Sequence, residues 1–204
     1  HLMTWDMYRQ RWMQEKKEGR DRDFFGLFMI SDRGAGKTHF LSVLGVTLQV
    51  EFQEFDGSSS ITWLVSSAHT DRDELDREIK DNFPFDGLWY TYAGYPKFQY
   101  RFTHGPTMKH ISAVKADSLK KGRVDFVLVN EPQKMAKRVP AFGLGRIKYK
   151  GGLAVFAGNP PTEQKGKWIL DWEEKYLERR ETAKPYPVRF VYLIKHRDNP
   201  DFTM

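Results

Sequence analysis

The stretch SDRGAGKTHF, residues 31–40, constrains the fold of this chain more than any other part of the sequence. An apolar run, FFGLFMI at 24–30, ends directly before it, and apolar residues recur at helical spacing through 38–52. A buried strand, a glycine-containing loop and a helix in this order leave backbone N–H groups open at the helix N-terminus, where anions bind. The closing letters GKT complete the phosphate-loop pattern G-x-x-x-x-G-K-[ST], in which Ser31 replaces the first glycine.

This loop predicts a site for the phosphates of a nucleoside triphosphate and for Mg²⁺. Backbone N–H groups from Gly34 to Lys37 are expected to surround the phosphates, with the Lys37 side chain at the β and γ phosphates and the Thr38 hydroxyl on the metal. Serine is tolerated at the first position where φ is negative, so Ser31 is compatible with this function. The alternative is a glycine-rich turn with an exposed lysine. The predicted nucleotide-binding residues of the loop are Ser31, Asp32, Arg33, Gly34, Ala35, Gly36, Lys37 and Thr38.

The rest of the chain alternates between strand and helix patterns. Buried strands are expected at 61–67, 124–131, 151–161 and 186–195, and helices at 4–22, 70–83 and 167–181. The aromatic segment 84–104 predicts an irregular β-hairpin, and 109–122 a strand followed by a loop. Such alternation is typical of an α/β fold with a mainly parallel central sheet flanked by helices.

Composition limits the choice of function. A chain of 204 residues with 40% hydrophobic residues forms one α/β domain, with room for a small appended subdomain. Cysteine is absent, which excludes disulfides and thiolate metal sites, and no apolar run approaches the ~18 residues of a membrane span. The net charge of +6 fits either simple solubility or contact with a polyanion such as nucleic acid.

Polar residues follow two of the expected strands. Ligands of parallel sheets bind beyond the carboxyl ends of the strands, so Asn130-Glu131 and Gly158-Asn159 are expected near the loop at 31–38. Glu131 can deprotonate the water that attacks a γ-phosphate. Asn130 can accept a hydrogen bond from a metal-bound water, and Asn159 can contact the γ-phosphate. Ordinary strand exits and a turn before the next two prolines are the alternatives for these pairs.

In their order and spacing, these motifs resemble the ATPase domain of phage terminase large subunits, the DNA-packaging motors of tailed viruses. The resemblance covers most of the chain and includes an arginine-bearing Walker A motif without its first glycine. The matching segments are YRQRW (8–12), SDRGAGKT (31–38), ITWLVSSAHTDRDELDREI (61–79), LKKGRVDFVLVNE (119–131), LAVFAGNPP (153–161) and HRDNPDF (196–202).

The resemblance implies further roles for individual residues. Arg33 would stabilise charge at the γ-phosphate, so the catalytic residues would be Glu131, Arg33 and Lys37. Gln10 would contact adenine, with Tyr8 or Trp12 packing nearby. The turn Gly158-Asn159 would couple hydrolysis to movement. Where the family usually has aspartate, Asn130 is neutral, which puts metal affinity and turnover in question. A residue acting in trans on a neighbouring subunit would be Lys121 or Arg123, although lysine lacks the bidentate fork of arginine.

The resemblance also implies an architecture and partners. We expect a P-loop NTPase of the RecA-like class, with a core at 4–162 and a small lid-like subdomain at 163–204. Residues 1–3 are interpreted as a cloning remnant. The C-terminal nuclease domain usual in the family has no counterpart in this chain. The implied partners are double-stranded DNA, a portal protein, a small terminase subunit and further copies in a ring, in the host cytoplasm and without a membrane. Lys134, Lys137 and Arg138 are candidate DNA contacts, because they follow the catalytic strand and are basic.

Three functions therefore stay open at this point. The first is a packaging motor that hydrolyses Mg-ATP. The second, motivated by Asn130, is an assembly module that binds nucleotide with little hydrolysis. The third is a helicase-like or recombinase-like P-loop ATPase outside viruses.

Overall fold

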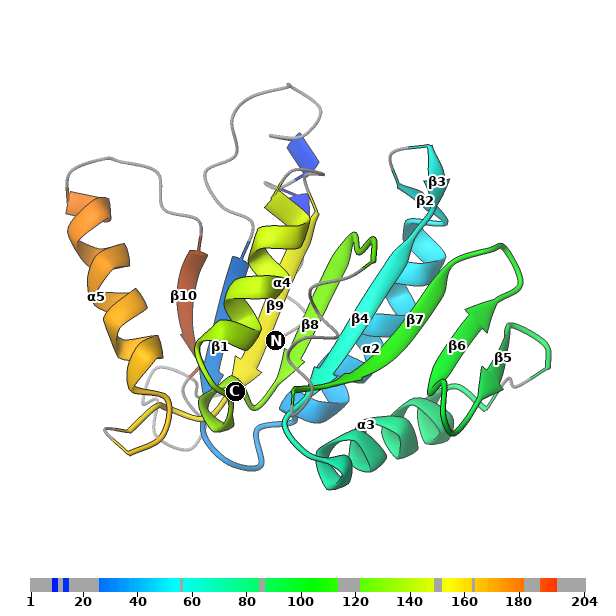
Figure 1. Cartoon of the computed structure of the whole chain (residues 1–204), viewed down its shortest axis with the longest axis horizontal. Coiled ribbons are helices and arrows are strands. Elements are labelled where there is room, and N and C mark those ends of the chain that lie inside the picture. Colours follow the sequence, from blue (N-terminus) through cyan, green and yellow to red (C-terminus); the bar gives the residue numbers. More distant parts are fainter. Residues whose placement is uncertain are drawn as a thin grey trace, which may run out of the picture.

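Strands from both halves of the chain meet in one eight-stranded sheet, with the order β10-β1-β9-β8-β4-β7-β6-β5 (Figure 1). The computed structural model describes residues 9–10, 13–14, 26–55, 57–84, 87–113, 122–148, 152–162, 164–181 and 188–193. In sheet order the strands are Val188–Leu193, Gly26–Ser31, Leu153–Gly158, Phe126–Asn130, Ile61–Ser66, Thr107–Ser112, Gln99–Phe102 and Tyr90–Ala93. The six strands from β10 to β7 are parallel, and β6 is antiparallel to both of its neighbours.

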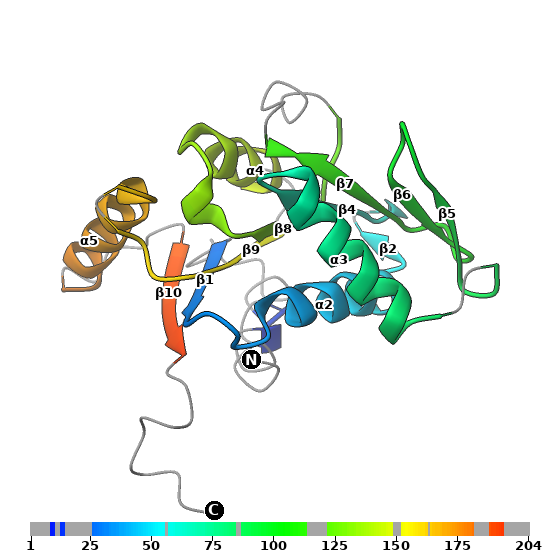
Figure 2. The same cartoon turned by 90° about the horizontal axis from the view of Figure 1, so that it is seen from below.

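Helices cover both faces of this sheet, because alternate residues of each buried strand point to opposite sides. In β1, Leu27 and Met29 pack with the helices α2 (Lys37–Glu51) and α3 (His69–Asn82). Phe28 and Ile30 instead pack with α4 (Arg138–Lys148) and α5 (Lys167–Glu181). Figure 2 shows the two pairs of helices on opposite sides of the strands. The expected mainly parallel sheet flanked by helices is confirmed.

The side on which α5 packs is rich in aromatic rings. Phe28 is stacked between Phe156 of β9 and Phe190 of β10, with ring centroids at 4.3 and 4.7 Å. Trp168 and Trp172 of α5 meet the same ring edge-on, at 6.0 and 5.9 Å. These contacts join three neighbouring strands to one another and hold α5 against the middle one, β1.

Three details of the structure go beyond the sequence-based expectation. The basic segment after Glu131 was not among the expected helices, but Pro132–Lys134 is a short 3-10 helix, η2, and α4 follows it. β10, which lies beyond the expected boundary at residue 162, pairs with β1 over six residues, and the expected division of the chain stays a prediction. Gly57 lies in a turn between two-residue strands, β2 (Glu54–Phe55) and β3 (Ser58–Ser59).

The aromatic segment forms the expected hairpin, β5 and β6, and this hairpin extends the central sheet through β7. Tyr90 and Tyr100 pack edge to face across it at 5.1 Å. Of the helix expected at 4–22, only 9–10 and 13–14 are described, and they are helical. No helix in the described part of the chain is long and apolar enough to span a bilayer.

Candidate functional site

The glycine-containing loop joins β1 directly to α2. Gly34 and Gly36 have φ values of 77° and 74°, a left-handed conformation that glycine adopts without strain. Gly36 is the N-cap of α2 and offers no side chain, so the N–H groups of the first helical turn face the loop. Ser31 is the last residue of β1 and has no positive φ, which explains why glycine is not needed there.

Lys37 folds back over this loop and is only 6% exposed. Its Nζ donates hydrogen bonds to the backbone oxygens of Ser31 and Asp32 at 3.0 and 2.6 Å, and to Oδ1 of Asn159 at 2.9 Å. All three of these acceptors are neutral oxygens. Lys37 therefore presents a nearly buried positive charge at the N-terminus of α2.

Glu131 lies at the carboxyl end of β8 beside this lysine. Residues Ile30 and Gly158 are paired across β1 and β9, as are Asn130 and Ala157 across β8 and β9, so three strand ends are adjacent. The carboxylate Oε2 of Glu131 accepts a hydrogen bond from Nδ2 of Asn159 at 3.0 Å. Asn159 thus contacts Lys37 through its oxygen and Glu131 through its nitrogen.

The backbone of Glu131 is strained. Its φ and ψ are 55° and 54°, a left-handed conformation that costs a residue with a side chain about 1–3 kcal/mol. A hydrogen bond from its N–H to the oxygen of Ala157, at 2.9 Å, holds it there. The turn sends the chain into η2, and Nε2 of Gln133 donates a second hydrogen bond to Oε2 of Glu131.

Asn130 offers a test of the expected metal site. The side chain is 1% exposed, and its Oδ1 has no hydrogen-bond partner among the described residues. An oxygen left in this way costs about 1–3 kcal/mol unless water or an ion meets it. Asn130 and Thr38 line one cleft, and Mg²⁺ takes oxygen ligands and keeps several waters. These residues therefore fit a magnesium ion held mainly by water and phosphate.

The cleft has a volume of about 660 Å³ and brings most of the predicted site together. Its far wall is acidic, since α3 contributes Asp71, Glu74 and Glu78. The remaining lining residues are Arg33, Gly34, Gly36, Lys37, Thr38, His39, Asn130, Glu131, Lys134 and Asn159. Arg33 is exposed in the loop, so its guanidinium is available to a bound molecule. A cleft with cations and helix N–H groups on one side suits a polyanion such as a nucleoside triphosphate.

Several predicted residues lie elsewhere. Gln10 is exposed and does not line the cleft, and Tyr8, Trp12 and Lys121 lie outside the described residues. Arg123 stands before β8, at the opposite edge of the sheet from Glu131. Its guanidinium pairs with the fully buried Asp125, with Nη2 3.1 Å from Oδ2. This gives Arg123 a partner in its own subunit.

The three candidate DNA contacts differ in their surroundings. Nζ of Lys134 lies 3.2 Å from Oδ1 of Asp71, so this lysine bridges η2 and α3 across the cleft. Lys137 and Arg138 are exposed at the start of α4. Asp71 is only 9% exposed and also accepts a hydrogen bond from the Ser67 hydroxyl.

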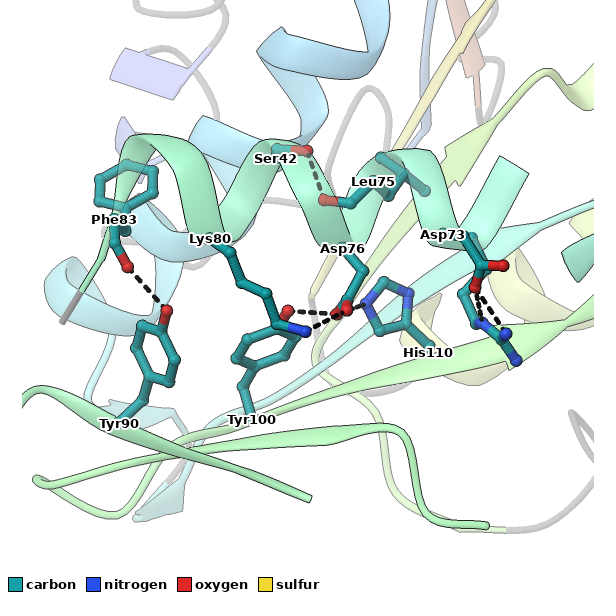
Figure 3. Close-up of polar contacts among 10 residues, drawn as sticks. Ser42, Asp73, Leu75, Asp76, Lys80, Phe83, Tyr90, Tyr100 and His110 are labelled. Carbon is teal, nitrogen blue, oxygen red and sulfur yellow. Dashed lines mark hydrogen bonds and ion pairs between the residues drawn. The ribbon is translucent and has the colours of Figure 1, made fainter. Parts of the chain in front are cut away.

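A second polar cluster holds α3 against the β5–β7 part of the sheet (Figure 3). Oδ1 of Asp76 accepts a hydrogen bond from the Tyr100 hydroxyl and lies 3.6 Å from Nε2 of His110, while Oδ2 accepts one from Nζ of Lys80 at 2.6 Å. Burial acts to raise the pKa of Asp76, but His110, Lys80 and Tyr100 outweigh it and hold this pKa well below its usual range. No motif indicated this cluster, because its members come from three elements, α3, β6 and β7.

The pKa values of the two tyrosines beside this carboxylate are raised, not lowered. Burial and the charge of Asp76 raise the pKa of Tyr92 to about 12. Burial and the hydrogen bond to Asp76 raise the pKa of Tyr100 well above its usual range. Both phenols therefore stay protonated at neutral pH. At the end of α3, the Tyr90 hydroxyl donates to the backbone oxygen of Phe83 at 2.7 Å.

Comparison with known proteins gives a match in structure only. No protein-family model and no curated protein matches the sequence. The large terminase of the thermophilic bacteriophage D6E has a TM-score of 0.62 and 14% identity, covering 89% of this chain and 43% of that one. The bacteriophage HK97 large terminase has a TM-score of 0.62 and 9% identity, covering 82% of this chain and 35% of that one.

This chain therefore spans less than half the length of either large terminase. A shorter structure, the N-terminal domain of the DNA packaging ATPase from bacteriophage phi29, has a TM-score of 0.52 and 13% identity. That match covers 89% of this chain and 94% of the phi29 domain. The chain thus has the fold shared by these phage large terminases and the phi29 packaging ATPase domain.

Proposed function

We propose that this chain is the ATPase motor domain of a viral terminase large subunit, which hydrolyses Mg-ATP to move double-stranded DNA into a procapsid. One observation carries the proposal: the loop lysine, the strand-end glutamate and the asparagine that contacts both line a single cleft at the carboxyl edge of the sheet. The fold supports it, and the large terminase of phage D6E has been solved in complex with ATP-gamma-S and with ADP.

The residues of the cleft suggest how each contributes to hydrolysis. Lys37 and the N–H groups at the start of α2 bind the phosphates of ATP, and Arg33 offsets the charge that develops on the γ-phosphate. Glu131 takes a proton from the attacking water as the water oxygen bonds to the γ-phosphorus and the bond to ADP breaks. Thr38 and Asn130 would hold the Mg²⁺, whose charge offsets that of the phosphates.

Asn159 is placed so that its hydrogen bonds depend on whether nucleotide is bound. Its side chain accepts a hydrogen bond from Lys37 at 2.9 Å and donates one to Glu131 at 3.0 Å. A phosphate that draws the ammonium of Lys37 toward itself removes one of these two bonds. We infer that Asn159 and Gly158 couple the nucleotide state to movement in this way.

The proposal also includes partners of the whole protein, of which this chain is one part. They are double-stranded DNA, a portal protein, a small terminase subunit and other copies of the chain in a ring, in the host cytoplasm. Lys137 and Arg138 are exposed at the start of α4 and suit a phosphate backbone. Lys134 would have to leave Asp71 before it could bind DNA. A role in trans for Arg123 would likewise require it to leave Asp125.

Steady-state ATP hydrolysis tests the proposal, with wild type compared with Glu131→Ala and with Lys37→Ala as the control for binding. We expect Glu131→Ala to bind Mg-ATP with an affinity within about twofold of wild type and to lose at least about 100-fold in kcat. Lys37→Ala should lose nucleotide binding itself. Hydrolysis by Glu131→Ala at the wild-type rate would rule out the assigned base.

A second candidate function rests on Asn130. A neutral side chain at this position gives the metal less charge than a carboxylate does. The chain would then bind nucleotide and drive assembly with little turnover. This alternative predicts tight Mg-ATP binding without detectable hydrolysis, even with DNA and partner proteins present. It also predicts that Asn130→Asp raises turnover.

A further inference from the structure

Gln133 holds the proposed base by a contact that is independent of the phosphate loop. Oε2 of Glu131 accepts hydrogen bonds from both Asn159 and Gln133, but only Asn159 also contacts Lys37. The second oxygen of the carboxylate, Oε1, accepts no hydrogen bond from the described residues. One oxygen of Glu131 is thus fixed, and the other is left for a water molecule.

Two glycines make the space for this glutamine. Gln133 is 7% exposed. A Cβ added to Gly158 would lie 2.4 Å from Oε1 of Gln133, and one added to Gly166 would lie 2.7 Å from its Cβ. Gly166 also has a φ of +84°, so a side chain at this position is disfavoured both by the close contact and by the left-handed backbone. The side chain of Gln133 is therefore enclosed by the end of β9 and by the loop that leads into α5.

The orientation of the carboxamide follows from its neighbours. Its nitrogen faces the Glu131 carboxylate, whereas its own Oε1 is buried without a hydrogen-bond partner in the described part of the chain. The opposite orientation would place two oxygens against each other, which is worse than one unpaired oxygen. Among the residues that the structure describes, the hydrogen bond of this buried carboxamide is thus made to the proposed base.

We propose that Gln133 is a positioning residue for Glu131. Nε2 of Gln133 holds Oε2 of Glu131. When Lys37 binds phosphate and leaves Asn159, the hydrogen bonds of Asn159 change, but Gln133 still keeps the Glu131 carboxylate in place. Because its side chain fills the space above Gly158 and beside Gly166, movement of Glu131 is also passed to the end of β9 and to the start of α5. The inference rests on the proposed ATPase function, and it adds a residue that no motif identifies.

Gln133→Met removes the donor and keeps the length of the side chain. We expect kcat for ATP hydrolysis to fall about 10- to 100-fold, with KM and Mg-ATP affinity within about twofold of wild type. Gln164→Met is the matched control, since Gln164 is exposed in the loop before α5, and it should behave as wild type. An unchanged kcat in Gln133→Met would overturn the inference and leave the ATPase function intact, whereas wild type without hydrolysis would overturn both.

A second variant distinguishes a positioning role of Gln133 from a purely structural one. Gln133→Glu keeps the size of the side chain but places two carboxylates together, so they share a proton and the pair titrates at raised pH. Its kcat relative to wild type should rise as pH falls from about 8 to about 6, because the introduced carboxyl group, once protonated, can again donate to Glu131. A purely structural role for Gln133 predicts a ratio that does not change with pH, and that result would contradict the inference.

Discussion

Replacing Gly158 by alanine tests how tightly the end of β9 is packed against the catalytic turn. The added Cβ would lie 2.4 Å from Oε1 of Gln133, about 1 Å short of ordinary van der Waals contact, and 2.7 Å from Cδ of Pro132. Backbone hydrogen bonds hold β9 between β1 and β8, so the strand yields less easily than the glutamine side chain. We therefore expect the carboxamide to move by about 1 Å and to lose its hydrogen bond to Glu131.

Overpacking of this kind costs about 1–3 kcal/mol, and a displacement of about 1 Å at a catalytic group costs about 100-fold in rate. Gly158→Ala should thus lower Tm by about 2–12 °C and kcat by about 100-fold, with nucleotide affinity preserved. Calorimetry, a phosphate-release assay and equilibrium nucleotide binding measure these quantities.

The matched control is the same substitution at Gly145 in α4, where an added Cβ meets nothing within 4 Å. Because alanine favours a helix interior over glycine by about 1 kcal/mol, Gly145→Ala should raise Tm by about 2–4 °C and leave kcat unchanged. A Gly158→Ala protein with the kcat and Tm of wild type would refute the packing that we describe around Gln133.

Three other perturbations have defined outcomes. Arg33→Ala should weaken ATP binding or turnover by at least about 10-fold while ADP affinity stays within about twofold, because the proposed contact is to the γ-phosphate; equal losses for both nucleotides would contradict this role. Asp76→Asn should destabilise the fold by about 3 kcal/mol at pH 7, since it breaks a largely buried ion-paired cluster. The folded-state pKa of Asp76 lies below the unfolded value of about 3.9, so its contribution is present above that pH and is lost as pH falls; urea titrations should show the difference in stability between the two proteins shrinking progressively below about pH 4. Neutralising Lys134, Lys137 and Arg138 together should flatten the salt dependence of DNA binding, and unchanged binding would exclude this segment.

Local patterns were enough to predict most of the sheet. Buried strands read as continuous apolar runs, and the loop at 31–38 set the order of strand, turn and helix. α4 was missed because its sequence, RVPAFGLGRIK, contains one proline and two glycines, which usually interrupt helices. Its formation depends on tertiary contacts instead: Val139 and Ile147 are buried in the same cluster as Val127 and Phe156 of the sheet.

The proximity of candidate site residues could be predicted where a residue belongs to a strand end or a phosphate loop. Lys37, Glu131 and Asn159 meet as expected, because adjacent parallel strands bring their carboxyl ends together. Gln133 could not be found in this way, since its place depends on the left-handed backbone of Glu131, a conformation that local sequence does not specify. Lys134 looked like a surface cation, and only the packing of α3 shows its pairing with Asp71.

A structure of this chain with a non-hydrolysable ATP analogue and Mg²⁺ tests the central claim most directly. We predict the triphosphate against the backbone N–H groups of 34–38, with Nζ of Lys37 moved from Asn159 to the phosphates. We further predict the metal beside Thr38 and a water molecule within hydrogen-bond distance of Oε1 of Glu131. Nucleotide bound away from this cleft, or Lys37 still on Asn159 with the triphosphate in place, would contradict the proposed site.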